Sequence, residues 1–186
     1  MAVAQAVPAI RRRITEEEFL CLPDDGHKWE LVDGEAKEVA MGHEHEAIGI
    51  QVAFLLKPFA RGRGVVAGSQ SGFRMVSGHI RSPDVPSTRK ERMSGGRPTE
   101  GLEDFAPDLA TEITSPSELP DDMTRKVAEY FGAGAEQVWH LFPETKQVTV
   151  YFSPFDTADF GLEEALDVGD LLPGFSCRAE EFFDLE

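Results

Sequence analysis

The sequence of 186 residues has few cysteines and no apolar segment of membrane-spanning length. Cys21 and Cys177 are its two cysteines, and they lie far apart without the spacing of a metal site. This scarcity favours a reduced, cytoplasmic protein over a disulfide-stabilised secreted one. The basic residues 11–13 follow a mildly apolar stretch instead of preceding it, which is the wrong order for a secretory signal. We therefore expect no membrane partner.

Several familiar catalytic motifs are also missing. The chain has no Gly-rich phosphate loop before a helix, no G-x-S-x-G segment and no H-E-x-x-H segment. Their absence argues against a P-loop nucleotide hydrolase, a serine hydrolase with a nucleophile elbow and a zinc protease of the H-E-x-x-H type.

Basic residues are scarce as well: 18 Lys and Arg stand against 34 Asp and Glu, for a net charge of −16. Because duplex affinity rests largely on phosphate neutralisation, this argues against a protein that coats nucleic acid. Residues 1–97 nevertheless hold 14 of the basic residues and 13 of the acidic ones. We expect weak, local DNA binding through this half, although a solvated surface is the alternative for any single residue. The basic residues concerned are Arg61, Arg63, Arg89, Lys90, Arg92 and Arg97.

Helical and strand patterns alternate along the chain. A capping box at 15–18 predicts a short helix, and residues 29–32 and 35–39 flank Asp33-Gly34 as a β-hairpin. A buried amphipathic helix is predicted from about 44 to 57, where Pro58 disturbs it. Further expected elements are a strand within 65–75, a strand at 109–114, a helix from Asp121 or Asp122, a hairpin of 137–142 and 147–152, and a C-terminal tail whose Leu and Phe residues clamp onto the core.

Residues 87–106 are rich in Gly, Ser, Thr, Arg and Pro, and we predict that they form a mobile connection. The chain length suits one well-buried domain without internal repeats. We therefore expect an N-terminal tail at 1–13 and a single domain at 14–186.

Two carboxylates and one ammonium carry the functional argument. Asp108 and Glu112 share a strand face, but four strand residues separate them by about 13 Å, which is too far for one metal ion. If 83–88 and 108–114 pair as antiparallel neighbours, Asp84 lies beside Glu112 instead. Lys126 stands four residues before Tyr130, so it borders the inward stripe of its helix.

Each of these residues has an ordinary structural interpretation. Asp84 can be a turn aspartate, and Lys126 can be a lysine that covers apolar surface. Glu112 lies in a strand that is expected to be central, where a carboxylate must be paired, bound to metal or facing a cleft. Together they predict metal-dependent phosphodiester hydrolysis: Asp84 and Glu112 hold Mg²⁺ or Mn²⁺, and Lys126 orients the attacking water or stabilises the developing charge.

Other residues are candidates for supporting roles. Glu30 and His45 are candidates for the metal shell, although Glu30 can also be the polar member of an alternating strand and His45 a hydrogen-bonded core histidine. Arg81 and the hydroxyls of Ser115 and Ser117 are candidate phosphate contacts.

A set of segments in fixed order resembles the Uma2 family, over about residues 14 to 183. The most specific part is the segment from Ala106-Pro-Asp to Ser115-Pro-Ser, followed by the later lysine. The other matching segments are Ile14-Thr-Glu-Glu-Glu-Phe-Leu, Trp29-Glu-Leu-Val-Asp-Gly-Glu, His45, Arg81-Ser-Pro-Asp-Val, Asp122-Met-Thr-Arg-Lys-Val-Ala-Glu-Tyr-Phe-Gly-Ala-Gly and Val148-Thr-Val-Tyr.

The resemblance places the chain among the PD-(D/E)XK nucleases. It implies an α/β fold with a restriction-endonuclease-like core, a mixed central sheet flanked by helices and additional β-hairpins. It implies an endonuclease that uses Mg²⁺ and acts on DNA, and a homodimer is one assembly that we consider. Asp84 and Glu112 correspond to the motif carboxylates. Thr114 occupies the usual lysine position, so Lys126 resembles the migrated lysine.

The sequence departs from its relatives at two places. Pro86-Ser-Thr replaces an apolar continuation of the strand that follows Asp84, which puts a regular ladder there in doubt because proline donates no hydrogen bond. Phe142 stands where an acid is common. The alternative function is a catalytically lapsed nuclease fold that acts as an acidic protein-interaction module. A glycoside hydrolase ranks behind both, because it leaves Lys126 and the metal without a purpose.

Overall fold

The computed structural model describes residues 13–23, 26–39, 42–115 and 118–186. A six-stranded sheet has the strand order β10-β9-β8-β7-β6-β3, and a four-stranded sheet has the order β2-β1-β5-β4. The larger sheet comprises β3 (Gly64–Val66), β6 (Val85–Arg89), β7 (Leu109–Ile113), β8 (Gln137–Phe142), β9 (Gln147–Ser153) and β10 (Asp156–Phe160). The smaller sheet comprises β1 (Lys28–Val32), β2 (Glu35–Val39), β4 (Phe73–Arg74) and β5 (Ile80–Arg81).

The remaining elements are helices and one short strand pair. The α-helices are α1 (Glu16–Leu20), α2 (His43–Ala60) and α3 (Pro120–Gly132). The strand pair is β11 (Ala165–Asp167) with β12 (Ser176–Arg178). The 3-10 helices are η1 (Lys90–Arg92), η2 (Ser94–Gly96), η3 (Gly169–Leu171) and η4 (Ala179–Phe183). None of the helices in the described ranges is long and apolar enough to span a bilayer.

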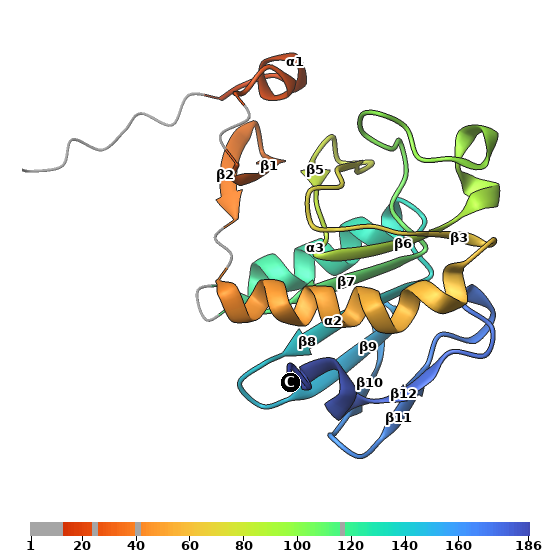
Figure 1. Ribbon diagram of the computed structural model, residues 1–186. Coiled ribbons are helices and arrows are strands. Elements are labelled where there is room, and N and C mark those ends of the chain that lie inside the picture. Colours follow the sequence, from red (N-terminus) through yellow and green to blue (C-terminus); the bar gives the residue numbers. More distant parts are fainter. Residues whose placement is uncertain (1–12, 24–25, 40–41, 116–117) are drawn as a thin grey trace, which may run out of the picture.

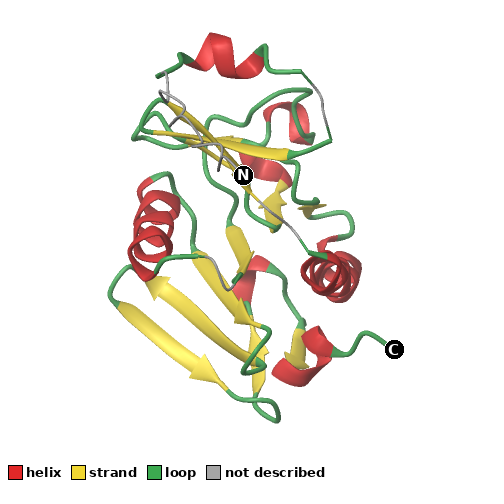
Figure 2. Ribbon diagram, turned by 90° about the vertical axis from the view of Figure 1, so that its left-hand side faces the viewer, coloured by secondary structure: helices red, strands yellow, loops and turns green. Residues whose placement is uncertain are grey.

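The six-stranded sheet is mixed, and the two long helices cover its opposite faces (Figures 1 and 2). β7 and β8 run parallel with α3 as the crossover, whereas its other strand pairs are antiparallel. Residues alternate along β7, so Leu109 and Ile113 pack in the core with α2, and Ala110 packs in the core with α3. The predicted mixed sheet with flanking helices and additional hairpins is confirmed.

Helix α2 buries one face through residues four positions apart: Ile48, Val52, Leu56 and Ala60. We predicted that Pro58 ends this helix, and that boundary is wrong, because α2 continues through Pro58 to Ala60. A proline in the last turn removes a single backbone hydrogen bond to the preceding turn. The packing of Leu56 and Ala60 against the sheet maintains the helix there.

The four-stranded sheet lies above one end of the larger sheet in Figure 1. Its β1–β2 hairpin turns at Asp33 and Gly34, which both have positive φ (54° and 76°), as a two-residue hairpin turn with two left-handed positions requires. This predicted hairpin is confirmed, with Val32 opposite Glu35. Because alternate strand residues share a face, Lys28 and Glu30 point the same way.

The prediction that residues 87–106 form a connection without regular structure is wrong at their start, and their mobility stays a prediction. Ser87 and Thr88 are buried residues of β6, paired with β3 on one side. η1 and η2 follow, and Met93 is buried. The composition misled the prediction because polar residues can complete a central strand when both edges of the backbone are paired.

Pro86 fits within β6 without disturbing the ladder. Its carbonyl accepts a hydrogen bond from the Ala67 N–H at 3.0 Å, just beyond the last residue of β3. The nitrogen and oxygen of a strand residue point to the same side. The missing proline N–H therefore faces past the end of β3, and the pairing with Ala110 of β7 is retained.

The C-terminal region completes the core on the α2 side. The β8–β9 hairpin has the predicted strands. Phe175 and Phe182 pack against Trp139, with ring centroids 6.1 and 5.6 Å away. Leu171, Leu172 and Phe183 belong to the same cluster, so the predicted clamp onto the core is confirmed.

Candidate functional site

Asp84 and Glu112 lie side by side at the end of two paired strands. β6 and β7 are antiparallel, with Val85 opposite Thr111, so the preceding Asp84 lies next to Glu112. Both carboxylates are almost completely buried, at 5% and 3% exposure. The pairing that we expected between these strands is confirmed. It brings two acids together at one sheet end, although they are separated by 28 positions in sequence.

Asp84 has three close polar contacts. Its Oδ1 accepts from Lys28 Nζ at 2.7 Å, and its Oδ2 accepts from the Ile113 N–H at 2.8 Å and lies 3.2 Å from His45 Nε2. Burial opposes ionisation, but the hydrogen bond from His45 and the charge of Lys28 outweigh it and lower the pKa of Asp84. Asp84 is therefore held as a carboxylate.

His45 stands in the first turn of α2 and contacts both strands. Its Nε2 lies 2.9 Å from the Ile113 carbonyl oxygen. A carbonyl oxygen only accepts, so Nε2 carries a proton and donates. With Nε2 directed toward Ile113 and Asp84, the other ring nitrogen points away from Asp84. That nitrogen, Nδ1, is buried and has no hydrogen-bond partner among the described residues. Desolvation lowers the pKa of His45, but Asp84 and the carbonyl reverse this and raise it.

Glu112 accepts from two groups of α3. Its Oε2 accepts from Lys126 Nζ at 3.2 Å, and its Oε1 accepts from the Tyr130 hydroxyl at 2.5 Å. Complete burial raises the pKa of Glu112, and the nearby Asp84 raises it further. The charge of Lys126 lowers this pKa but does not cancel the effect of burial. Lys126 also lies 3.0 Å from Glu118. Desolvation opposes its charge, yet Glu112, Glu30 and Glu118 together raise the pKa of Lys126, which keeps it cationic.

Glu30 and Arg81 form the side of the site that comes from the four-stranded sheet. Arg81 Nη1 donates to Glu30 at 2.8 Å, and the Ser82 N–H donates to Glu30 at 3.0 Å. Arg81 Nε donates to Glu129 of α3 at 2.6 Å. Burial disfavours the charge of Glu30, but Lys126 and Arg81 lower its pKa overall. Arg81 Nη2 is buried without a partner in the described part of the chain.

These side chains surround one cleft of about 170 Å³. Of the candidate catalytic, metal-shell and phosphate-contact residues, all except Ser117 line it, and Ser117 lies outside the described residues. The lining residues from that prediction are Glu30, His45, Arg81, Asp84, Glu112, Ser115 and Lys126. In the described ranges, no group of three or more His, Cys, Asp or Glu side chains gathers as a metal cage.

Sequence reasoning missed two residues that contact the paired carboxylates. Lys28 stands two positions before Glu30, so strand periodicity places it on the same face of β1. Tyr130 stands four positions after Lys126, on the same face of α3. Both signals were present in the sequence. What was missing was the docking of β1 against β6, which no local pattern reports.

Comparisons with known proteins concern the family and the fold of the chain. The Uma2 family, described as "Putative restriction endonuclease", matches residues 16–180. A solved structure described as a "putative nuclease belonging to DUF820" from Anabaena variabilis aligns with a TM-score of 0.81 at 20% sequence identity. That alignment covers 92% of this chain and 98% of the other, which shows a shared fold. A search of curated proteins found no match.

Proposed function

Since this chain belongs to the Uma2 family, we propose that it is a metal-dependent endonuclease that hydrolyses phosphodiester bonds of DNA. The observation that carries the proposal is the pair of buried carboxylates, Asp84 and Glu112, on adjacent strands of one cleft with Lys126 on Glu112. We propose that residues 14–186 form this nuclease as one domain in the cytoplasm. The net charge of −16 leads us to expect weak DNA binding.

The donor set fits Mg²⁺ or Mn²⁺. Mg²⁺ prefers hard oxygen ligands and is usually held by one or two carboxylates together with waters and substrate phosphates. Asp84 and Glu112 would hold the ion, and the cleft leaves space for water and a phosphate. A divalent ion bound there lowers the pKa of a water and offsets the negative charge of the phosphodiester.

Lys126 supplies a positive charge and hydrogen-bond donors. Because its neighbours keep it cationic, it acts by orienting the attacking water or by stabilising the charge that develops on the phosphate, and not as a base. Glu118 and Glu112 both hold its ammonium, at 3.0 and 3.2 Å. Two contacts restrict the flexible lysine stem, so the donor is positioned before the substrate arrives.

The surrounding residues position the two carboxylates. His45 fixes Asp84 from α2, and Tyr130 fixes Glu112 from α3. Glu30 stands behind them and is held by Arg81, so we propose both as supports. The free Nη2 of Arg81 and the cleft-lining Ser115 are the proposed phosphate contacts.

Cleavage and metal binding test the proposal together. In low salt with Mg²⁺ or Mn²⁺, the purified protein is expected to nick or cut DNA, and Glu112→Gln is expected to abolish cleavage by removing a ligand charge. Glu163→Gln is the matched control, because Glu163 is exposed far from the cleft in sequence and lines none of it. A wild-type protein that binds neither ion at millimolar concentration and cuts no DNA or RNA contradicts the proposal.

The second candidate is a lapsed nuclease that acts as an acidic interaction module. The ion pairs at Asp84 and Glu112 favour it, because Lys28 and Lys126 already balance both charges. This candidate predicts no cleavage under any divalent ion. It also predicts that Glu112→Gln leaves partner binding unchanged.

A further inference from the structure

Three neighbouring hollows follow one another along α2, beginning at the cleft. The cleft shares His45 and Asp84 with a hollow of about 250 Å³, and this hollow shares Lys57 and Val66 with a third hollow of about 630 Å³. We name the two outer hollows the α2 channel. It runs between α2 and the edge strand β3, over about 24 Å from His45 to the end of the helix.

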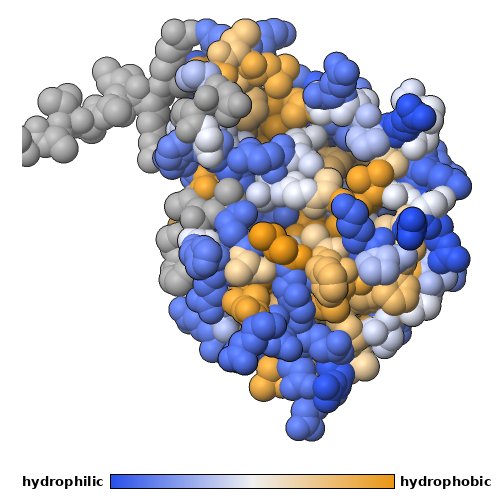
Figure 3. All heavy atoms as spheres, in the orientation of Figure 1, coloured by the Kyte–Doolittle hydropathy of each residue, from blue (hydrophilic) through white to orange (hydrophobic). Residues whose placement is uncertain are grey.

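The helix side of the channel is unusually apolar for a surface. Ile50 and Phe54 are 70% and 69% exposed and stand on the side of α2 away from its buried residues. Ile50 lines the hollow of about 250 Å³, whereas Phe54 and Pro58 of α2 line the hollow of about 630 Å³ together with Val65 and Val66 of β3. Figure 3 shows apolar atoms gathered on this face, over α2, with strongly polar groups beside them.

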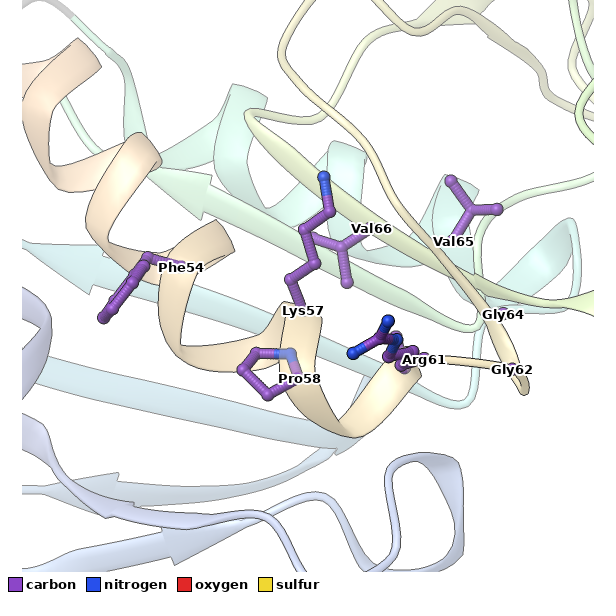
Figure 4. Close-up of a pocket in the computed structure, with 9 residues that line it drawn as sticks. Phe54, Lys57, Pro58, Arg61, Gly62, Gly64, Val65 and Val66 are labelled. Atoms are coloured by element: carbon purple, nitrogen blue, oxygen red, sulfur yellow. The ribbon is translucent and has the colours of Figure 1, made fainter.

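Two cations stand at the outer end of the channel. Lys57 and Arg61 are four positions apart, and their side chains make no hydrogen bond or ion pair with any residue that the structure describes. Figure 4 shows Lys57 reaching from α2 toward Val66, with Arg61 one turn later at the end of the helix. Like charges at this spacing disfavour a helix slightly. The helix dipole favours cations here, but it explains neither the hollow nor its apolar walls.

Most other arginines of the chain are neutralised. Arg74, Arg81, Arg89, Arg92, Arg125 and Arg178 each pair with at least one carboxylate. Lys57 and Arg61 differ from these arginines because no carboxylate of the described residues pairs with them, and they border an apolar hollow. A phosphate group can pair with the positive charges of Lys57 and Arg61, and an unstacked base can pack against the apolar wall of the hollow.

We propose that the α2 channel binds a single-stranded segment of nucleic acid that extends from the carboxylate cleft. Its phosphates lie at Lys57 and Arg61, and its bases lie against Phe54 and Ile50. This inference rests on the proposed nuclease function. A duplex is the poorer fit, because its base faces are hidden in the stack and only phosphates and groove edges reach a protein. The channel thus selects an overhang, a frayed end or a single strand.

Binding without divalent ions tests the channel independently of cleavage. In low salt with EDTA, the anisotropy of a short fluorescent oligodeoxynucleotide is expected to report binding of the single strand in preference to the same sequence as a duplex. The double variant Lys57→Ala with Arg61→Ala is expected to weaken single-strand affinity about tenfold. It is also expected to reduce the slope of log affinity against log salt by about 1.4, or about 0.7 for each lost phosphate contact.

The apolar wall has its own variant and control. Phe54→Ala is expected to weaken single-strand binding at least about fivefold through lost base stacking, without changing the salt slope. Phe155→Ala makes the same chemical change at the β9–β10 turn, where Phe155 is exposed, and is expected to bind as wild type. Lys146→Ala with Arg13→Ala is the control for the net charge, because both residues are exposed outside the channel.

Any one of four results overturns the proposal. Two concern the wild type: undetectable single-strand binding, or a duplex bound as tightly as the single strand. The other two are wild-type affinity and salt slope in the Lys57 and Arg61 double variant, and unchanged binding in Phe54→Ala. A change of sedimentation mass in Phe54→Ala with unchanged oligonucleotide affinity assigns this face to a second copy of the chain and also overturns it. Failure of the nuclease proposal is separate, since it is read from cleavage and metal binding by the wild type.

Discussion

The two ends of β7 each hold a buried carboxylate, and they differ in their partners. Asp108, just before the strand, is 2% exposed and accepts from the Arg89 N–H at 2.7 Å and from the guanidinium of Arg89 at 2.9 Å. Arg92 lies 3.4 Å away. Glu112, near the other end, accepts from an ammonium and a phenol and lines a cleft.

Burial alone therefore does not distinguish the proposed catalytic acid from an acid that only ties elements together. Guanidinium groups hold a carboxylate in a fixed fork, so Asp108 has a structural role in tying η1 to β7. Glu112 has a single ammonium partner, which also contacts Glu118, so we expect that this carboxylate can exchange one partner for a metal ion or a water. The two ends therefore predict opposite responses to the loss of a charge.

The largest expected effect is on cleavage. Glu112→Gln is expected to slow DNA cleavage about a thousandfold, because it removes a charge that acts on the transition state. The free energy of unfolding is expected to change by less than about 1 kcal/mol. Lys126 retains its ion pair with Glu118, and the Tyr130 hydroxyl can still donate to the amide oxygen of the new glutamine. Single-turnover cleavage and urea unfolding of the same samples measure both. Strong destabilisation of the protein by Glu112→Gln would show that Glu112, like Asp108, mainly supports the fold, and it would contradict the contrast between the two ends of β7.

The next effect concerns pH. His140 lies beside Glu112 in the β7–β8 register, and both its ring nitrogens are buried without partners in the described residues. Burial lowers the pKa of His140 from 6.5 to about 4, and Lys126 adds to this. The unfolded chain thus binds this proton at higher pH than the folded protein. Its contribution to stability is complete above about pH 6.5, and about 3 kcal/mol is lost as the pH falls toward 4.

Urea unfolding between pH 4 and 8 measures this contribution. His140→Leu is expected to lack that part of the pH dependence, whereas His43→Leu, at an exposed position, retains it. An identical pH profile for His140→Leu and the wild type would show that His140 titrates normally in the folded protein.

A smaller effect, on the free energy of unfolding, is expected at the end of β7 that is next to Asp108. Asp108→Asn is expected to reduce the free energy of unfolding by about 2 kcal/mol, because an amide oxygen replaces a carboxylate that holds two guanidinium groups. Cleavage per folded molecule is expected to stay at the wild-type level. Asp170→Asn, at an exposed site, is the matched control, and a loss of cleavage without a loss of stability would assign Asp108 to the functional site.

The smallest effect is on metal affinity. Lys28→Met is expected to tighten Mn²⁺ binding about tenfold, because it removes a positive charge 2.7 Å from Asp84 and frees its Oδ1. Isothermal titration calorimetry measures the affinity. Lys37→Met removes a cation from the wall of the same cleft without breaking a contact to Asp84, so it is the control. Equal or weaker binding by Lys28→Met would mean that Lys28 does not compete with the ion.

Much of the fold followed from local patterns. The capping box at Thr15 is formed, and the Asp33-Gly34 turn sets the β1–β2 register. Period-two and helical patterns located the strand that carries Glu112 and the helix that carries Lys126, and the expected antiparallel pairing placed Asp84 beside Glu112. The errors lay at Pro58 and at Ser87 and Thr88, where tertiary packing outweighs local propensity.

The sequence by itself determined most of the longer strands and helices and which of their residues share a face, because the 2.0 and 3.6 residue periods are properties of short segments. From these it predicted Asp84, Glu112 and Lys126 as one cluster. Only the tertiary structure decided that Lys28 reaches Asp84, 56 positions away, and that two hollows extend the cleft along α2. Both depend on how separately formed layers pack together, and contacts between distant segments leave no periodic signal in the chain.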